Sequence, residues 1–212
     1  MPKYAHYTFK DGGIALWRVD ESADELYSLL HTQCYDLALS AMRNETRRAE
    51  WLAIRVLLAD VLGDDKIIAY KESGAPYLTD KSYHISISHT RGYAVIAYHK
   101  HKTIGVDVEY ISERVMRIAH RFTRQEEYEY INQVAENNRL MYYILNWSAK
   151  ETLYKYVDDV QNVDFKKSFY LSPYEIQPSH GEIVGQLCLH SMRQVRLFYY
   201  IFSDIVCTCC ID

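Results

Sequence analysis

The 212-residue sequence predicts an α+β protein made of two helix-plus-sheet halves. Some stretches repeat apolar residues at helical spacing, and others alternate apolar and polar residues at strand spacing. Both kinds of stretch occur before and after the polar run His99–Lys102. We therefore expect an N-terminal half over residues 1–100 and a C-terminal half over residues 101–212.

The predicted elements follow one another along the whole chain. They are a helix over 40–63, a turn over 73–78, strands over 83–89, 92–99 and 103–111, helices over 112–131 and 137–157, and strands over 166–173, 182–191 and 196–204. Leu52, Val56 and Ala59 give the first helix an apolar stripe, and Gly63 typically ends a helix. Two alternating stretches around the turn at 90–92 predict a β-hairpin.

Two carboxylates on one strand are the first chemical signal. In residues 103–111, Ile104 and Val108 point to one face while Asp107 and Glu109 point to the other, roughly 7 Å apart. Like charges this close raise each other's pKa unless they share a positive charge. Either this face is solvated or it holds a cation.

A third carboxylate lies on the helix over 137–157. The apolar stripe of Leu140, Ile144 and Trp147 continues to Glu151. Alone, Glu151 could simply pair with Lys155 one turn later on the surface. Together with the strand carboxylates it offers an oxygen-rich site for Mg²⁺, which usually also binds substrate phosphates.

Composition excludes several classes of protein. A formal charge of -4 argues against a general nucleic-acid binder. The N-terminus lacks the apolar run of a signal peptide, and no segment has the ~20 apolar residues of a membrane helix, so we expect a cytoplasmic protein. Cys207, Cys209 and Cys210 lack metal-site spacing, which favours buried thiols over a soft-metal site.

Four motifs in order, "GAPYL", "ISISHT", "IGVDVEYI" and "WSAKETLYK", resemble the 4'-phosphopantetheinyl transferases of the Sfp (surfactin-type) class. The resemblance covers roughly Lys71 to Lys155. It implies a pseudo-two-fold α+β fold with coenzyme A in the cleft between the halves. It also implies a monomer that modifies an apo acyl or peptidyl carrier protein.

The resemblance implies a Mg²⁺-dependent transfer of the phosphopantetheine arm of coenzyme A to a carrier serine, with release of 3',5'-ADP. Mn²⁺ is the alternative metal. Asp107, Glu109 and Glu151 would hold the metal, and Glu151 would also be the general base. Lys155 would stabilise charge on the phosphoryl oxygens and on the leaving group.

Coenzyme A contacts follow from the same resemblance. Family members often read G-K-P where this chain has Gly74, Ala75 and Pro76, so Lys71 or an arginine would replace the lost lysine contact. Which of two neighbouring arginines reaches the 3'-phosphate stays open. The residues expected to contact coenzyme A are Arg47, Arg48, Lys71, Pro76, Ser88, His89, Lys150 and Lys155.

Carrier proteins of this kind present acidic helices, which suggests a basic docking surface. Arg114, Arg117, Arg121 and Arg124 recur at helical spacing on the helix over 112–131. The alternative is a solvated face balanced by neighbouring glutamates. Two other functions stay open: a non-catalytic module that binds carrier protein or coenzyme A, and a metal-dependent nuclease. Nuclease sites commonly place a lysine on the carboxylate strand, where this chain has Tyr110.

Overall fold

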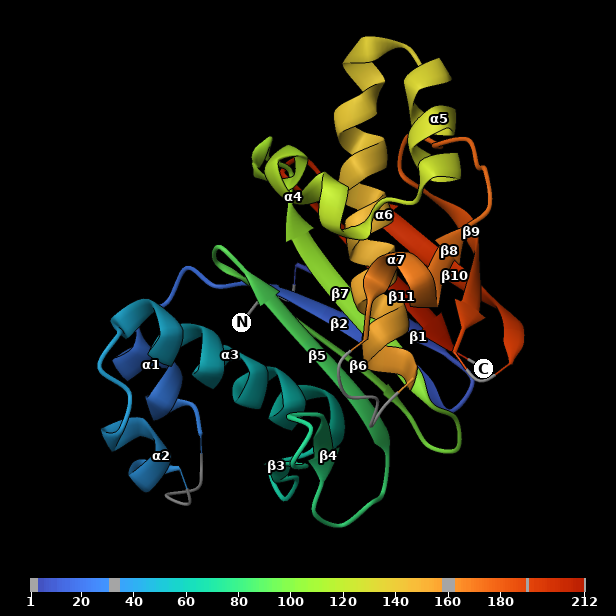
Figure 1. The fold of residues 1–212 in the computed structure, drawn as a ribbon. Coiled ribbons are helices and arrows are strands. Elements are labelled where there is room, and N and C mark those ends of the chain that lie inside the picture. The colour runs from blue at the N-terminus through green and yellow to red at the C-terminus, as the bar shows by residue number, and fades with distance from the viewer. Residues whose placement is uncertain (1–3, 31–34, 158–162, 190, 212) are drawn as a thin grey trace. The chain divides into compact units, whose positions relative to one another are not determined.

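The computed structural model describes residues 4–30, 35–157, 163–189 and 191–211, and it confirms the predicted α+β class (Figure 1). The chain divides into two compact units, residues 1–101 and 102–212, which we call unit 1 and unit 2. The boundary falls inside the polar run His99–Lys102. In the described ranges, no helix combines the length and apolar character needed to cross a membrane.

Unit 1 contains a four-stranded antiparallel sheet in the order β1-β2-β6-β5, a short β3-β4 pair and helices beside them. Its elements are β1 (Ala5–Phe9), β2 (Gly12–Arg18), α1 (Ala23–Ser28), α2 (Asp36–Ser40), α3 (Glu45–Leu62), β3 (Ile68–Tyr70), β4 (Pro76–Leu78), β5 (His84–Thr90) and β6 (Tyr93–His99). Helix α3 packs against β2 and β6, and its buried side chains form the core with that sheet.

The predicted first helix begins later than expected. Asn44 caps α3, because its side-chain oxygen accepts a hydrogen bond from the N–H of Arg47 at 2.9 Å. Residues 40–43 therefore lie outside the helix. Its predicted end is confirmed, since Gly63 follows Leu62 with a positive φ of 104°.

The hairpin prediction in unit 1 is confirmed. β5 and β6 pair in antiparallel register around Arg91 and Gly92, and Gly92 has a φ of 75°. The turn predicted over 73–78 is partly wrong, because Pro76–Leu78 forms β4, which pairs with β3. Only the first part of that segment turns, at Gly74 with a φ of 86°.

Unit 2 is built on a five-stranded antiparallel sheet in the order β7-β11-β10-β9-β8. Its elements are β7 (Ile104–Tyr110), α4 (Arg114–Phe122), α5 (Gln125–Gln133), α6 (Glu136–Val157), α7 (Phe165–Ser168), β8 (Phe169–Leu171), β9 (His180–Cys188), β10 (Met192–Ile201) and β11 (Ile205–Ile211). The three clustered cysteines are buried in β11, as predicted. Of the other two cysteines, Cys188 ends β9 and Cys34 lies outside the described residues.

The helix predicted over 112–131 is wrong as one element, because the chain turns between α4 and α5. Thr123 and Arg124 have extended backbone angles. The Glu127 carboxylate accepts a hydrogen bond from the Arg124 N–H at 2.7 Å, which caps the start of α5. Arg124 therefore leaves the predicted arginine stripe, and only Arg114, Arg117 and Arg121 share α4.

Helix α6 lies directly against β7 and β11 (Figure 1). Gly105 permits this approach: a Cβ there would lie 2.5 Å from the carbonyl oxygen of Thr152 on α6. A side chain at this position would push the helix away from the strand. The glycine therefore sets the distance between the two elements that carry the predicted carboxylates.

Candidate active site

Strand β7 and helix α6 bring the predicted carboxylates to one region of unit 2. Asp107 is buried, with 3% of its surface exposed. Its Oδ1 accepts a hydrogen bond from Lys155 Nζ at 2.7 Å, and its Oδ2 accepts one from Ser148 Oγ at 2.9 Å. Glu109 Oε1 accepts a hydrogen bond from Trp147 Nε1 at 2.7 Å. Both strand carboxylates are thus held by side chains of α6.

A chain of buried hydroxyls supports Asp107 from β11. Thr208 lies opposite Asp107 in the β7-β11 register. Its Oγ1 is 2.9 Å from Ser148 Oγ and 2.6 Å from Thr152 Oγ1. Each hydroxyl has one proton, and that of Ser148 is donated to Asp107. Thr208 therefore donates to Ser148, so the chain of donors ends on the carboxylate.

Burial and mutual repulsion change the acidity of the other two carboxyl groups. Burial, followed by the charge of Asp107, raises the pKa of Glu109 to about 7. The same two causes raise the pKa of Glu151 to about 7, with Lys155 opposing them. The three acidic groups are therefore close enough to interact, and additional positive charge would stabilise their ionised forms.

The carboxylates do not already form a closed metal cage. In the part of the chain that the structure describes, no group of three His, Cys, Asp or Glu side chains is arranged to hold a metal ion. The Lys155 ammonium instead supplies positive charge to Asp107. A cation at this region would need further ligands from water or substrate, or a rearrangement of side chains.

These pKa values predict that stability decreases as pH rises. The ordinary pKa of glutamate is 4.5, so between pH 4.5 and 7 the unfolded chain has released protons that folded Glu109 and Glu151 still hold. The free energy of unfolding should therefore fall by about 1–3 kcal/mol between pH 5 and 8. Urea unfolding in chelating buffer measures this fall.

The variant Glu151→Gln should lose part of that pH dependence, because its side chain does not ionise. The matched control is Glu129→Gln, which changes an exposed carboxylate of α5. If the free energy of unfolding fell equally steeply with pH in the native chain and in Glu151→Gln, Glu151 would have an ordinary pKa in the folded protein.

Lys150 lies in a separate ion pair, and its role in phosphate binding stays a prediction. Its side chain is fully buried, and its Nζ lies 2.6 Å from Glu127 Oε2 and 2.6 Å from the carbonyl oxygen of Phe122. Burial lowers the pKa of Lys150 to about 8, with the charge of Glu127 opposing this effect. Its ammonium could reach phosphate only if this ion pair broke.

The residues predicted to contact coenzyme A in unit 1 lie on three elements. Arg47 is exposed in the first turn of α3. Arg48 follows it and places Nη1 3.5 Å from Glu45 Oε2. On β5, Ser88 is buried, whereas exposed His89 places Nδ1 3.3 Å from Glu50 Oε2 of α3.

The β3-β4 hairpin carries the two remaining residues of that set. The Lys71 N–H donates to the Ala75 carbonyl at 2.9 Å, and Pro76 begins β4 opposite Tyr70. The structure thus connects His89 with α3 through Glu50, and it connects the hairpin with α3 because Arg55 Nη2 donates a hydrogen bond to the Tyr70 hydroxyl at 3.3 Å. The coenzyme A roles of these residues stay predictions.

Sequence reasoning missed three side chains that hold the carboxylates: Trp147, Ser148 and Thr208. Trp147 was assigned only to an apolar stripe, although its indole N–H donates to Glu109. Ser148, Thr152 and Lys155 recur at helical spacing beside Glu151, and this polar stripe was a usable signal. Thr208 lies within the cysteine cluster and gave no signal, because its role depends on strand register.

Comparisons with known proteins agree with the sequence motifs. Residues 103–210, about half of the chain, match the pattern of the 4'-phosphopantetheinyl transferase superfamily. The 4'-phosphopantetheinyl transferase gsp of Aneurinibacillus migulanus is 34% identical over 107 residues, covering 49% of this chain and 44% of that protein. The 4'-phosphopantetheinyl transferase HetI of Nostoc sp. (strain PCC 7120) is 25% identical over 176 residues, covering 75% of this chain and 74% of HetI.

Proposed function

The chain belongs to the 4'-phosphopantetheinyl transferase superfamily, and we propose that it moves the phosphopantetheine arm of coenzyme A onto a serine of an apo acyl or peptidyl carrier protein. The products are holo carrier protein and 3',5'-ADP. The observation that carries this proposal is the meeting of Asp107, Glu109, Glu151 and Lys155 across β7 and α6. We assign the chain to the Sfp class, whose motifs it resembles.

The donor set fits Mg²⁺ or Mn²⁺, because its side chains are carboxylates. Mg²⁺ usually takes one or two protein carboxylates and completes its shell with water and substrate phosphates, so a closed protein cage is not required. Asp107, Glu109 and Glu151 would hold the ion. When bound, it would neutralise charge on the pyrophosphate as a Lewis acid.

The protein's own groups would carry out the proton transfer and position the substrate. The carrier serine oxygen attacks the phosphorus that bears the pantetheine arm, and the phosphoanhydride bond to 3',5'-ADP breaks. Glu151 would take the serine proton, and a pKa of about 7 suits a general base at neutral pH. Lys155 would move from Asp107 toward the phosphoryl oxygens and stabilise their charge.

Mass spectrometry of an apo carrier protein tests the proposed function. With coenzyme A and Mg²⁺, we expect the carrier to gain the mass of one phosphopantetheine arm, and a chelator should stop the gain. A panel of acyl and peptidyl carriers covers the classes of partner. If the chain bound coenzyme A but modified no carrier, the non-catalytic module would replace the transferase.

Helix α4 supplies the proposed docking surface for the carrier. Arg114, Arg117 and Arg121 are exposed there and form no ion pair with described residues. An acidic carrier helix would be attracted to this surface.

The double variant Arg117→Glu and Arg121→Glu should raise the KM for the carrier about tenfold, because like charges repel the acidic helix. The KM for coenzyme A should not change. The matched control is Arg196→Glu, which reverses an exposed charge on β10. An equal rise in the KM for the carrier in Arg196→Glu would contradict α4 as the docking surface.

A further inference from the structure

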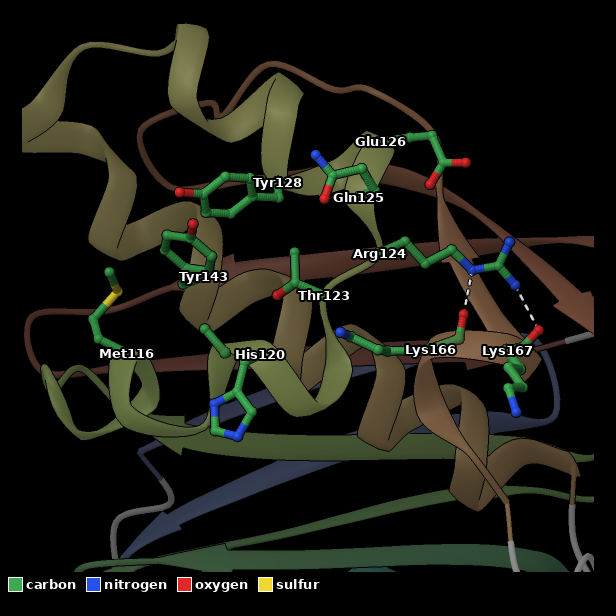
Figure 2. A pocket seen from close by; sticks show the side chains of 11 residues that line it. Met116, His120, Thr123, Arg124, Gln125, Glu126, Tyr128, Tyr143, Lys166 and Lys167 are labelled. Carbon is green, nitrogen blue, oxygen red and sulfur yellow. Dashed lines mark hydrogen bonds between the residues drawn. The ribbon is translucent and has the colours of Figure 1, made fainter.

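A pocket in unit 2 lies between α4, α5, α6 and α7 (Figure 2). Its volume is about 860 Å³, within the range of small-molecule sites. Neither the predicted metal ligands nor Lys155 line it. The metal binding and proton transfer proposed above therefore do not account for this pocket.

Polar groups converge on one part of the pocket. Thr123 is 5% exposed, and its Oγ1 finds no hydrogen-bond partner among the described residues. Figure 2 shows the Lys166 ammonium extending toward Thr123 and His120, whereas the Lys167 ammonium points away. The Lys166 ammonium forms no ion pair with a described side chain. A buried hydroxyl without a partner is costly, and a bound acceptor that it reached by rotation of the Thr123 side chain would satisfy it.

One side of the pocket is apolar and aromatic. Met116, Tyr128 and Tyr143 lie together on the side opposite Lys167 (Figure 2). Such side chains bind flat or apolar groups. The Glu126 carboxylate also belongs to the lining, but Figure 2 shows it directed away from the Lys166 ammonium. An anion near Thr123 would therefore face more positive than negative charge.

The walls of the pocket are joined by hydrogen bonds from one side chain to backbone carbonyl oxygens. The Arg124 guanidinium donates hydrogen bonds to the carbonyl oxygens of Lys166 and Lys167. These bonds connect α7 to the turn between α4 and α5. The same turn holds Thr123, and α5 begins immediately after it with the partial positive charge of a helix N-terminus. The backbone segments that carry Thr123 and Lys166 are thus held together without a ligand.

We propose that this pocket binds a small anionic ligand whose carboxylate or phosphate contacts Lys166 and Thr123 and whose apolar body packs on Met116, Tyr128 and Tyr143. Charge complementarity specifies the anionic group, and the aromatic lining specifies the body. The site is independent of phosphopantetheinyl transfer and requires neither coenzyme A nor a metal.

Isothermal titration of the full chain with phenyl phosphate, benzoate and inorganic phosphate tests this site. We expect phenyl phosphate or benzoate to bind at one site, and whichever binds more tightly identifies the anionic group. Inorganic phosphate should bind at least tenfold more weakly than phenyl phosphate. No binding of either aromatic anion would overturn the proposal, and so would equal affinity for the two phosphates where phenyl phosphate is the tighter aromatic ligand.

Three variants locate the binding to the proposed residues. Lys166→Met and Thr123→Val should each weaken binding about tenfold, whereas the neighbouring Lys167→Met should leave it unchanged. Without ligand, Thr123→Val should not lower the melting temperature, because the native hydroxyl has no partner to lose. A clear loss of stability in Thr123→Val, or equal weakening in Lys167→Met, would contradict the proposal.

A competition experiment separates this ligand from a docked protein. An apo carrier protein added at saturating concentration should not displace phenyl phosphate. Displacement would assign the pocket to protein docking and overturn a small-molecule site. Because binding is measured without coenzyme A, failure of the transferase proposal would not affect this result.

Discussion

Replacing Glu151 by glutamine is expected to lower the rate of carrier modification by about 10²–10⁴-fold, the usual contribution of a general base. Glutamine keeps the size of the side chain but cannot accept the serine proton at neutral pH. It also removes one of the three carboxylate ligands proposed for the metal. Single-turnover mass spectrometry of the carrier measures the rate, and titration calorimetry with Mg²⁺ measures the loss of metal affinity.

The variant should still fold, because Glu151 has a raised pKa and its ionised form is not stabilised by burial. Above pH 7, Glu151→Gln is expected to be at least as stable as the native chain. Glu129→Gln, which alters an exposed carboxylate of α5, serves as the control and should retain full activity. If Glu151→Gln kept its native rate, another group would be the base.

With Glu151 as the base, the activity of the native chain should rise with pH through about 7, because Glu151 must lose its own proton before it can accept the proton of the carrier serine. A bound cation would favour the ionised carboxylate and move this rise to lower pH. The pH dependence at several Mg²⁺ concentrations therefore reports on base and metal together.

Local signals in the sequence were sufficient where one residue type decides the structure. Gly63 ends α3 and Gly92 turns the β5-β6 hairpin, because each adopts a positive φ that other residues avoid. Between α4 and α5 there is no glycine or proline. The break there depends on Glu127, which caps Arg124 from a buried position. Its partners on α6 and β8 are distant in sequence and were not predictable from local spacing.

In the candidate site, too, local spacing predicted some features, whereas others depended on distant parts of the chain. Strand alternation placed Asp107 and Glu109 on one face, and the apolar stripe of α6 pointed to Glu151; these three groups do interact. The prediction that Lys150 contacts phosphate treated α6 as a helix with one buried stripe. From Tyr142 onward, most side chains of α6 are buried, since strands and helices surround it. Lys150 therefore faces the protein interior.

Removing the Lys150 ammonium is expected to give the largest loss of stability. Lys150→Met would leave the Glu127 carboxylate buried without its partner, which typically costs about 3–5 kcal/mol. Glu127 also accepts hydrogen bonds from the N–H groups of Arg124 and Leu171 at 2.7 and 2.9 Å. Urea unfolding measures the loss. The control Arg196→Met breaks an exposed ion pair with Glu182 and should cost about 1 kcal/mol or less.

A double-mutant cycle distinguishes the charge of the pair from its backbone hydrogen bonds. Glu127→Gln keeps one oxygen that can accept an N–H hydrogen bond but has no charge. The double variant Lys150→Met and Glu127→Gln should therefore lose at least about 2 kcal/mol less free energy of unfolding than the sum of the two single losses. The physical reason is that the double variant contains no unpaired buried ion. Additive losses would instead mean that Lys150 acts mainly through its hydrogen bond to Phe122. In that case its ammonium would hold the end of α4 in place, and its pairing with Glu127 would contribute little to the stability of unit 2.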